Sequence, residues 1–267
     1  MPHVHPSAIV DPSAELADDV HVGPGAVVGA GVRIASGTRL IGQCWIEGPT
    51  EIGTGNLIYP NVSIGLAPQS LSYDPSTPGR GVVIGDDNVM REGVTVHRAM
   101  TDDGPTTIGS RNFLMSSVHV GHDCRVADRI VMASGAVLAG HVIVEPAVTF
   151  GGLSGIHQFC RVGRGAMIGG GTVSTKDVPM YWTVTANTFA GAVNLVGMRR
   201  AGMDRREIDL ARWVFRRLNR EGLAGVNAIE GLRDREDEPL VAEYLNWLKD
   251  SKRGWISNRK RASRGTA

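Results

Sequence analysis

The chain has 267 residues, and its 28 Lys and Arg residues nearly balance 27 Asp and Glu residues, for a net charge of +1. This length suits one large repeat domain with a small appendage, and the near-neutral charge argues against a general nucleic-acid-binding protein. The sequence has no run of about 18 apolar residues, and its first residues lack the basic and apolar segments of a signal peptide. It therefore predicts a cytoplasmic protein with no stable membrane insertion.

A six-residue repeat governs the first segment of the chain. From Val10 to Ile64 an apolar residue falls on every sixth position. A helix would require apolar spacings of three and four, and a half-buried strand would require a spacing of two. A six-residue period is typical of a parallel β-helix, in which three hexapeptides make one triangular coil of about eighteen residues.

Two segments interrupt this repeat. The first, at about 66–83, contains Pro68, Pro75, Pro78 and Gly79, and the second spans about 97–107. We expect both to be external loops, because functional loops are commonly inserted into rigid repeat stacks.

The repeat is strictest in the segment that follows the loops. Its apolar positions are Ile108, Leu114, Val120, Val126, Met132, Leu138, Val144, Phe150, Ile156, Val162 and Ile168. All the hexapeptides together predict about eight coils. The residue two positions before each apolar one also points inward, because side chains alternate along a strand.

The cysteines occupy this second inward position. Cys44, Cys124 and Cys160 all fall on it, which predicts core residues rather than a disulfide set or a zinc cluster. A nucleophilic role for Cys124 beside His122 is the alternative, and it is disfavoured because the side chain should face the interior.

Three histidines share one corner of the predicted coil. With eighteen residues per coil, His122, His141 and His157 fall at nearly the same place in three consecutive coils. They would step by about 4.8 Å along the prism. We take this corner, with His119 nearby, as the candidate active site.

The chemistry of this corner suits acyl transfer. A neutral histidine can act as a base near pH 7, and the adjacent Asp123 can orient the ring of His122 and stabilise its imidazolium form. Gly140 can offer a backbone N–H to a developing oxyanion. Such a site would activate a hydroxyl or an amine toward an acyl carbonyl.

Two other interpretations of the histidines stay open. A single histidine on a solenoid face is most often a solvated surface residue, although three at one corner disfavour chance. Three histidines can also hold a catalytic zinc ion with an open site. The predicted row runs along the prism axis, however, whereas zinc ligands converge on one point about 2 Å from each nitrogen.

The C-terminal part of the chain changes character. The repeat fades through 177–179, and from about Gly191 the sequence is charged and helical. Asp204 and Glu207 form a capping-box pattern at the start of one helix, and a second helix is predicted from about Pro239. Helices of this length bury little surface alone, so they should pack on the solenoid or on a neighbouring subunit. The sequence therefore predicts two domains, 1–190 and 191–267, with a basic C-terminal tail.

Several motifs in order resemble one family. They are His5–Val10, Arg91–Arg98, His119–Cys124 (HVGHDC), Leu138–His141 (LAGH), His157–Cys160 (HQFC), Asp177–Pro179 and Arg199–Arg200. Over nearly its whole length the chain resembles the UDP-N-acetylglucosamine O-acyltransferases of lipid A synthesis. The resemblance implies a mainly β protein, a left-handed parallel β-helix of hexapeptide repeats with a small C-terminal α-helical domain.

The resemblance also implies an activity and partners. The enzyme would transfer a 3-hydroxyacyl chain from acyl carrier protein to the 3-hydroxyl of UDP-N-acetylglucosamine. It would act as a homotrimer with active sites between the prisms, and it would need no metal or other cofactor.

Residue roles follow from the same resemblance. His122 would be the general base, Asp123 would orient it, and Gly140 would supply the oxyanion N–H. The substrate path would be lined by Gln69, His97, His119, His141, His157, Gln158, Asn194 and Arg200. Acyl-chain length would be set by Gly170, with Met167 lining the same groove. The acidic carrier protein would dock on Arg212, Arg216 and Arg217.

The chain departs from the family pattern on the acceptor side. Ser70 and Ser72 stand where the family commonly has an acid and a lysine. Val196 replaces a typical glutamate, and Ala201 stands where a second basic residue is common. Two alternatives therefore stay open: N-acylation of a related sugar such as the 3-amino analogue, and a non-catalytic paralogue that binds acyl carrier protein.

Overall fold

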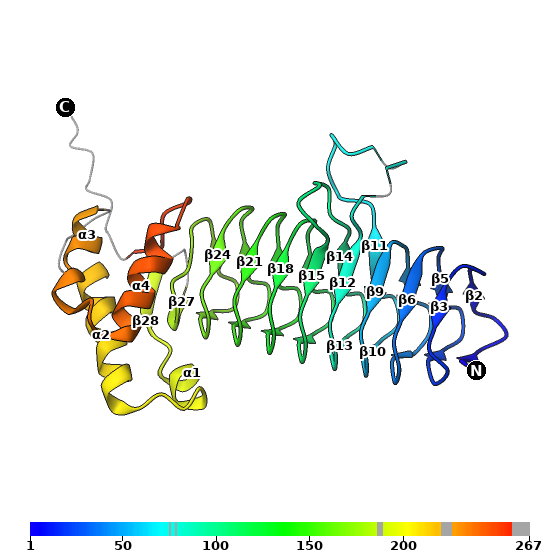
Figure 1. Cartoon of the computed structure of the whole chain (residues 1–267), viewed down its shortest axis with the longest axis horizontal. Coiled ribbons are helices and arrows are strands. Elements are labelled where there is room, and N and C mark those ends of the chain that lie inside the picture. The colour runs from blue at the N-terminus through cyan, green and yellow to red at the C-terminus, as the bar shows by residue number, and fades with distance from the viewer. Residues whose placement is uncertain (75, 78, 186–188, 220–225, 258–267) are drawn as a thin grey trace.

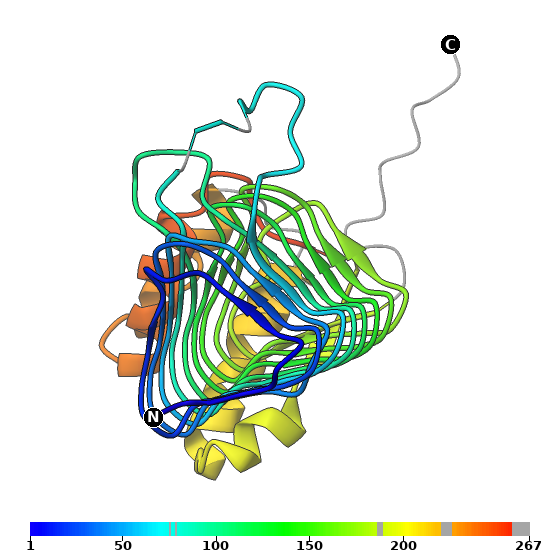
Figure 2. The same ribbon diagram turned by 90° about the vertical axis from the view of Figure 1, so that its right-hand side faces the viewer.

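The computed structural model describes residues 1–74, 76–77, 79–185, 189–219 and 226–257. The first two thirds of the chain wind into a left-handed parallel β-helix, a three-sided prism with the N-terminus at one end and the helices at the other (Figures 1 and 2). The predicted fold class and its left-handed sense are confirmed.

Each side of the prism is one sheet of short strands. Sheet A consists of β1 (His3–Val4), β4 (His21–Val22), β7 (Arg39–Leu40), β10 (Leu57–Ile58), β13 (Val89–Met90), β16 (Phe113–Leu114), β19 (Val131–Met132), β22 (Thr149–Phe150), β25 (Met167–Ile168), β27 (Trp182–Thr185) and β28 (Phe189–Val193). Sheet B consists of β2 (Ile9–Val10), β5 (Val27–Val28), β8 (Trp45–Ile46), β11 (Ser63–Leu66), β14 (Thr95–His97), β17 (His119–Val120), β20 (Val137–Leu138), β23 (Gly155–Ile156) and β26 (Val173–Ser174). Sheet C consists of β3 (Glu15–Leu16), β6 (Val32–Ile34), β9 (Thr50–Ile52), β12 (Val82–Ile84), β15 (Thr106–Ile108), β18 (Arg125–Val126), β21 (Ile143–Val144) and β24 (Arg161–Val162).

The register between neighbouring coils is eighteen residues over most of the prism, as in the pairing of His119 with Val137 and of Val137 with Gly155. It falls to sixteen at the last coil, where Met167 pairs with Thr183. Sheet A carries ten parallel strands before β28 pairs antiparallel with β27. The prism therefore has about ten coils, and the predicted eight was too few.

The interior is the apolar ladder that the repeat predicts. From Val20 onward both inward positions of the hexapeptides are buried, as Val118 and Val120 show with no exposed surface. Cys44, Cys124 and Cys160 are buried free cysteines, which confirms their placement in the core. Burial raises the pKa of the Cys44 and Cys160 thiols to about 11 and raises that of Cys124 to about 12. Raised values favour the protonated thiol over the nucleophilic thiolate.

A ladder of three buried asparagines ties four successive coils together at one corner. Asn88 donates from its amide nitrogen to Asn56 Oδ1 at 2.9 Å, and its own Oδ1 accepts the backbone N–H of Asn112 at 2.9 Å. Asn112 Oδ1 in turn accepts the N–H of Ile130 at 2.7 Å. The ladder crosses the part of the prism from which both loops emerge, so the register is kept there by side-chain hydrogen bonds.

Both predicted loops are present and project from the same side of the prism (Figures 1 and 2). They are shorter than expected, because β11 extends to Leu66, β12 begins at Val82, β14 includes His97 and β15 begins at Thr106. The first loop is held down by Arg98, whose guanidinium donates to the Tyr73 hydroxyl at 3.1 Å and to the Thr77 carbonyl at 3.1 Å.

The C-terminal region covers the end of the prism with helices α1 (Leu195–Arg200), α2 (Arg205–Asn219), α3 (Val226–Glu230) and α4 (Pro239–Lys249) and the 3-10 helix η1 (Arg233–Arg235). The predicted capping box is formed, since Glu207 N–H donates to Asp204 Oδ1 and Asp204 N–H donates to the Glu207 carboxylate. The predicted domain boundary at 190/191 falls inside β28.

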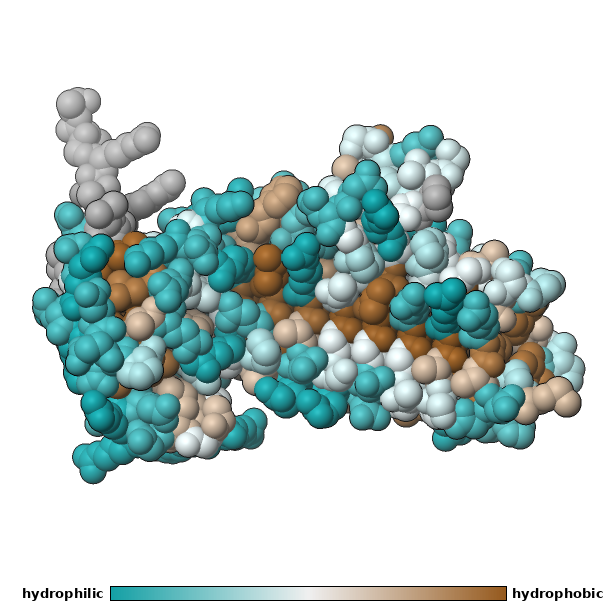
Figure 3. All heavy atoms as spheres, viewed as in Figure 1, coloured by the Kyte–Doolittle hydropathy of each residue, from teal (hydrophilic) through white to brown (hydrophobic). Residues whose placement is uncertain are grey.

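Helix packing on the prism end is specific. Trp182 of β27 meets Phe215 of α2 with ring centroids 5.0 Å apart. The buried Tyr244 hydroxyl of α4 donates to the Met180 carbonyl at 2.7 Å. Hydrophilic side chains cover the outer surface of these helices, whereas a hydrophobic band follows the prism (Figure 3). Within the described part of the chain, no helix is long and apolar enough to cross a membrane.

Candidate active site

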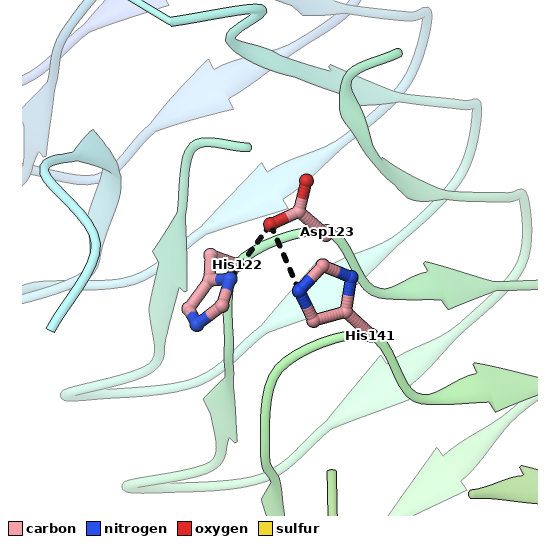
Figure 4. A group of neighbouring side chains, drawn as sticks. All are labelled: His122, Asp123 and His141. Carbon is pink, nitrogen blue, oxygen red and sulfur yellow. Dashed lines mark hydrogen bonds and ion pairs between the residues drawn. The ribbon is translucent and has the colours of Figure 1, made fainter. Parts of the chain in front are cut away.

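The predicted corner holds a hydrogen-bonded histidine and aspartate. His122 and Asp123 form the turn between β17 and β18, and His122 Nδ1 lies 2.6 Å from Asp123 Oδ2 (Figure 4). The side chains are 18% and 6% exposed, respectively. Asp123 has a φ of +59°, a left-handed conformation that aspartate tolerates better than most residues. The turn thus places the carboxylate behind the imidazole and leaves Nε2 to face outward.

Asp123 accepts hydrogen bonds from the loop between β14 and β15 in addition to the one from His122. Its Oδ1 accepts from the Thr101 hydroxyl at 2.6 Å and from the Thr101 N–H at 3.0 Å. Its Oδ2 accepts from the Met100 N–H at 3.1 Å. Burial acts to raise the pKa of Asp123, but the hydrogen bonds from Thr101, His122 and Met100 outweigh it and lower the pKa. The carboxylate therefore stays charged at neutral pH.

His141 follows in the next coil. Its ring meets the His122 ring edge-on with centroids 5.1 Å apart, and its Nε2 lies 3.7 Å from Asp123 Oδ2. On its other side it stacks on Phe159, 4.4 Å away and nearly parallel. Burial lowers the pKa of His141, against the opposing charge of Asp123. A neutral His141 can both donate and accept a hydrogen bond.

Gly140 lies under the His122 ring. A Cβ at this position would be 2.5 Å from His122 Cε1 and 2.6 Å from Nε2, so only glycine admits the ring there. Among the described hydrogen bonds, none has the Gly140 N–H as its donor. The N–H that we expect to bind an oxyanion therefore has no described acceptor and lies beside His122.

His119 and His97 lie on the neighbouring rungs of sheet B. His119 Nδ1 is 2.8 Å from the Thr95 hydroxyl, and the His97 ring is 5.2 Å from the His119 ring. Burial, with smaller effects of His97 and His122, lowers the pKa of His119 to about 4. His97 Nδ1 lies 2.7 Å from the Ala67 carbonyl, and its buried Nε2 has no partner among the described groups. A buried imidazole nitrogen ordinarily has a hydrogen-bond partner.

The geometry also bears on the zinc alternative. The possible ligand atoms of His122, Asp123 and His141 lie within 4.8 Å of one another. Among the described residues, no other three His, Cys, Asp or Glu side chains come this close together. Two ligands of a tetrahedral zinc would lie about 3.3 Å apart, however, and the 2.6 Å between His122 and Asp123 is the distance of a hydrogen bond. We interpret the group as a proton-transfer site.

A cavity of about 420 Å³ lies beside the pair on the side of sheet C. Asp123 and His141 line it together with residues that the sequence did not single out, among them Thr101, Arg125, Phe159, Arg161 and Lys252. Phe159 could have been found from the eighteen-residue coil, since it lies one coil after His141. Thr101 and Lys252 lie outside the repeat, and no periodic signal marks them.

The other predicted substrate residues make no described contact with the pair. His157 is exposed, and its Nδ1 lies 3.2 Å from the Arg253 guanidinium; Gln158 and Gln69 are also exposed. Asn194 caps α1 by accepting the Gly197 N–H at 3.0 Å, and Arg200 ends that helix exposed. Helix α1 lies on the side of the prism opposite to the loops (Figures 1 and 2), so one chain does not bring Asn194 and Arg200 to the pair.

The remaining predicted residues lie on sheet A and on α2. Met167 is half-buried on sheet A, and Gly170 is exposed at the corner between sheets A and B. On α2, Arg212 pairs with Asp209 at 3.2 Å and Arg217 with Asp234 at 3.4 Å, while Arg216 is exposed. These residues lie on the surface, and the contacts within one chain do not test their predicted roles.

Comparison with known proteins identifies relatives. A family model described as UDP-N-acetylglucosamine O-acyltransferase, domain 2, matches residues 177–256. The chain is 42% identical over 265 residues to the acyl-[acyl-carrier-protein]–UDP-N-acetylglucosamine O-acyltransferase of Leptothrix cholodnii, covering 96% of this chain and 100% of that protein. It is 39% identical to the protein of the same name from Stutzerimonas stutzeri, covering 94% and 98% of the two chains.

Solved structures agree along the same length. The UDP-N-acetylglucosamine acyltransferase of Francisella novicida superposes with a TM-score of 0.91 at 34% identity, covering 95% of this chain and 94% of that one. The UDP-N-acetylglucosamine O-acyltransferase of Moraxella catarrhalis gives 0.90 at 38% identity, covering 95% and 99%. Since these relatives match nearly end to end, the chain belongs to the UDP-N-acetylglucosamine O-acyltransferase family.

Proposed function

We propose that this protein transfers a 3-hydroxyacyl chain from acyl carrier protein to the 3-hydroxyl of UDP-N-acetylglucosamine, the first step of lipid A synthesis, in the cytoplasm. The names of its relatives give the carrier protein and the nucleotide sugar. The observation that carries the proposal is the His122–Asp123 pair with the Gly140 N–H beside it, which has no acceptor among the described residues.

The proposed reaction uses these three groups in sequence. His122 Nε2 accepts the proton of the sugar 3-hydroxyl as its oxygen attacks the thioester carbonyl. Asp123 stabilises the imidazolium through the Nδ1–H hydrogen bond, and the Gly140 N–H donates to the oxyanion. When the C–S bond breaks, His122 returns the proton to the thiolate, leaving an ester and the free carrier thiol.

Binding is assigned to the surrounding residues by family resemblance. The acceptor would contact Gln69, His97, His119, His141, His157, Gln158, Asn194 and Arg200. Gly170 and Met167 would bound the acyl chain, and Arg212, Arg216 and Arg217 of α2 would meet the acidic carrier protein. All of these residues except the buried His97 are exposed or partly buried, which is compatible with contact to a ligand or partner.

A homotrimer would complete this site. The outward row of sheet B has no charged residue among its described positions, which are Ile9, Val27, Trp45, Ser63, Thr95, His119, Val137, Gly155 and Val173. Sheet A has one, Arg39, whereas sheet C has Glu15, Arg33, Glu51, Arg125 and Arg161. Packing sheet B of one copy on sheet A of the next would close a ring of three. It would set the catalytic corner, which joins sheets B and C, at the outer rim of the interface.

A turnover assay tests the proposal. It would use a 3-hydroxyacyl carrier protein as donor and compare UDP-N-acetylglucosamine with its 3-amino analogue, with and without chelator. Ester product from the first sugar, unaffected by chelator, is the expected result. Product from the amino sugar alone would replace O-acylation by N-acylation, consistent with the uncharged Ser70 and Ser72, whose hydroxyls hydrogen-bond to each other. Absence of product from both would refute the proposal.

A further inference from the structure

The loop between β14 and β15 reaches back to the catalytic corner. Thr101 gives Asp123 Oδ1 both of its donors, the hydroxyl at 2.6 Å and the backbone N–H at 3.0 Å. The Met100 N–H donates to Asp123 Oδ2 at 3.1 Å, and this oxygen also faces His122. The backbone N–H of Asp123 in turn donates to the Thr106 hydroxyl at 2.8 Å. The inserted segment therefore holds the Asp123 carboxylate, while the first residue of β15 holds its backbone N–H.

We propose that Thr101 is a positioning residue for catalysis, which fixes Asp123 so that Oδ2 faces His122 Nδ1. This inference rests on the proposed function for its kinetic test, although the contact itself is independent of the substrate. Thr101 acts through Asp123 and is not required to touch the reacting atoms.

The two carboxylate oxygens of Asp123 have different partners: Oδ1 binds Thr101, and Oδ2 faces His122. An aspartate carboxylate turns readily, because its terminal torsion is broad. With Oδ1 engaged twice by Thr101, such a turn would break two hydrogen bonds to a charged acceptor, each stronger than a neutral one. The loop thus supplies the orientation that the repeat does not.

Three variants test the role. Thr101→Val removes the hydroxyl and keeps the side-chain shape, Thr101→Ser restores the hydroxyl, and Thr107→Val removes a hydroxyl from the adjacent strand β15, away from Asp123. We expect Thr101→Val to lower kcat about tenfold, from the loss of one hydrogen bond to a charged group. KM for the nucleotide sugar should stay unchanged. Thr101→Ser should restore most of kcat, and Thr107→Val should match the wild type.

A double-mutant cycle separates positioning from general stabilisation. If Thr101 acts through Asp123, adding Thr101→Val to Asp123→Ala should lower the residual kcat less than twofold. An undiminished tenfold loss in that background would overturn the inference, as would wild-type kcat in Thr101→Val or an equal loss in Thr101→Ser.

A spectroscopic readout keeps the contact testable apart from turnover. The proton shared between His122 Nδ1 and Asp123 should give a downfield proton resonance that disappears in His122→Ala. Thr101→Val should shift or broaden this resonance and Thr101→Ser should preserve it; an unmoved signal in Thr101→Val would contradict the inference. Failure of the proposed acyl transfer would instead be seen in the wild-type assay, before any variant is made.

Discussion

Substitution of Gly140 by alanine is the sharpest test of the catalytic geometry. The added Cβ would lie 2.5 Å from His122 Cε1, whereas ordinary contact begins at 3.4 Å. The imidazole must therefore move by about 0.9 Å, and a misplacement of about 1 Å costs on the order of 100-fold in rate. The Gly140 N–H is retained, so the loss reports the position of the base rather than the loss of the oxyanion donor.

The assay is steady-state turnover of the acyl donor by Gly140→Ala, compared with Gly152→Ala. Gly152 holds the same place in its hexapeptide, and a Cβ there would meet only the Ser134 carbonyl oxygen at 3.4 Å. We expect a loss of about 100-fold in kcat for Gly140→Ala and less than twofold for Gly152→Ala. Wild-type kcat in Gly140→Ala would show that the ring does not need its place over the backbone, and the assignment of His122 as base would fail.

Three further predictions follow from named contacts. His122→Ala should abolish turnover while size-exclusion chromatography still shows the native oligomer; retained turnover would refute the base. Gly170→Met should shift product toward shorter acyl chains, since a Cβ there meets only Gly152 at 3.4 Å and the protein should fold; an unchanged chain profile in mass spectrometry would contradict it. The pKa of His119 is lowered to about 4, below its unfolded value near 6.5, so the stability that its neutral form contributes is present above pH 6.5 and is lost as the pH falls toward 4. After allowance for the partial exposure of His119, this stability is about 1–2 kcal/mol. The urea midpoint, measured between pH 6.5 and pH 4, should depend less on pH in His119→Gln than in the wild type. An equal pH dependence in the two proteins would exclude the effect.

The sequence predicts the prism because each hexapeptide repeats the same burial. Val118 and Val120 are buried because they hold the two inward positions of a hexapeptide, as do the corresponding pairs from Val20 onward. The six-residue period alone therefore predicts the strands and their register. It underestimates the coils at both ends, where β1 precedes the first counted repeat and β27 follows the break at 177–179.

The proposed catalytic pair could also be predicted from the sequence, because His122 and Asp123 are neighbours in it. Contacts made by segments outside the repeat could not be predicted. Thr101 contacts Asp123, 22 residues away in the sequence, and Arg253 contacts His157, 96 residues away. Both contacts depend on how a segment outside the repeat folds back onto the prism. Such contacts arise from loop closure, which leaves no periodic trace in the sequence.

The asparagine ladder has a consequence for how this scaffold tolerates change. Asn56 and Asn88 are 32 residues apart, and Asn88 and Asn112 are 24 apart, against 18 for Asn112 and Ile130. The excesses over one coil, 14 and 6 residues, are the two insertions. Because the hydrogen bonds join the same corner whatever the chain does between them, loop length is uncoupled from the stacking of the coils. The prism can thus accept exchanged or grafted loops without rebuilding its core.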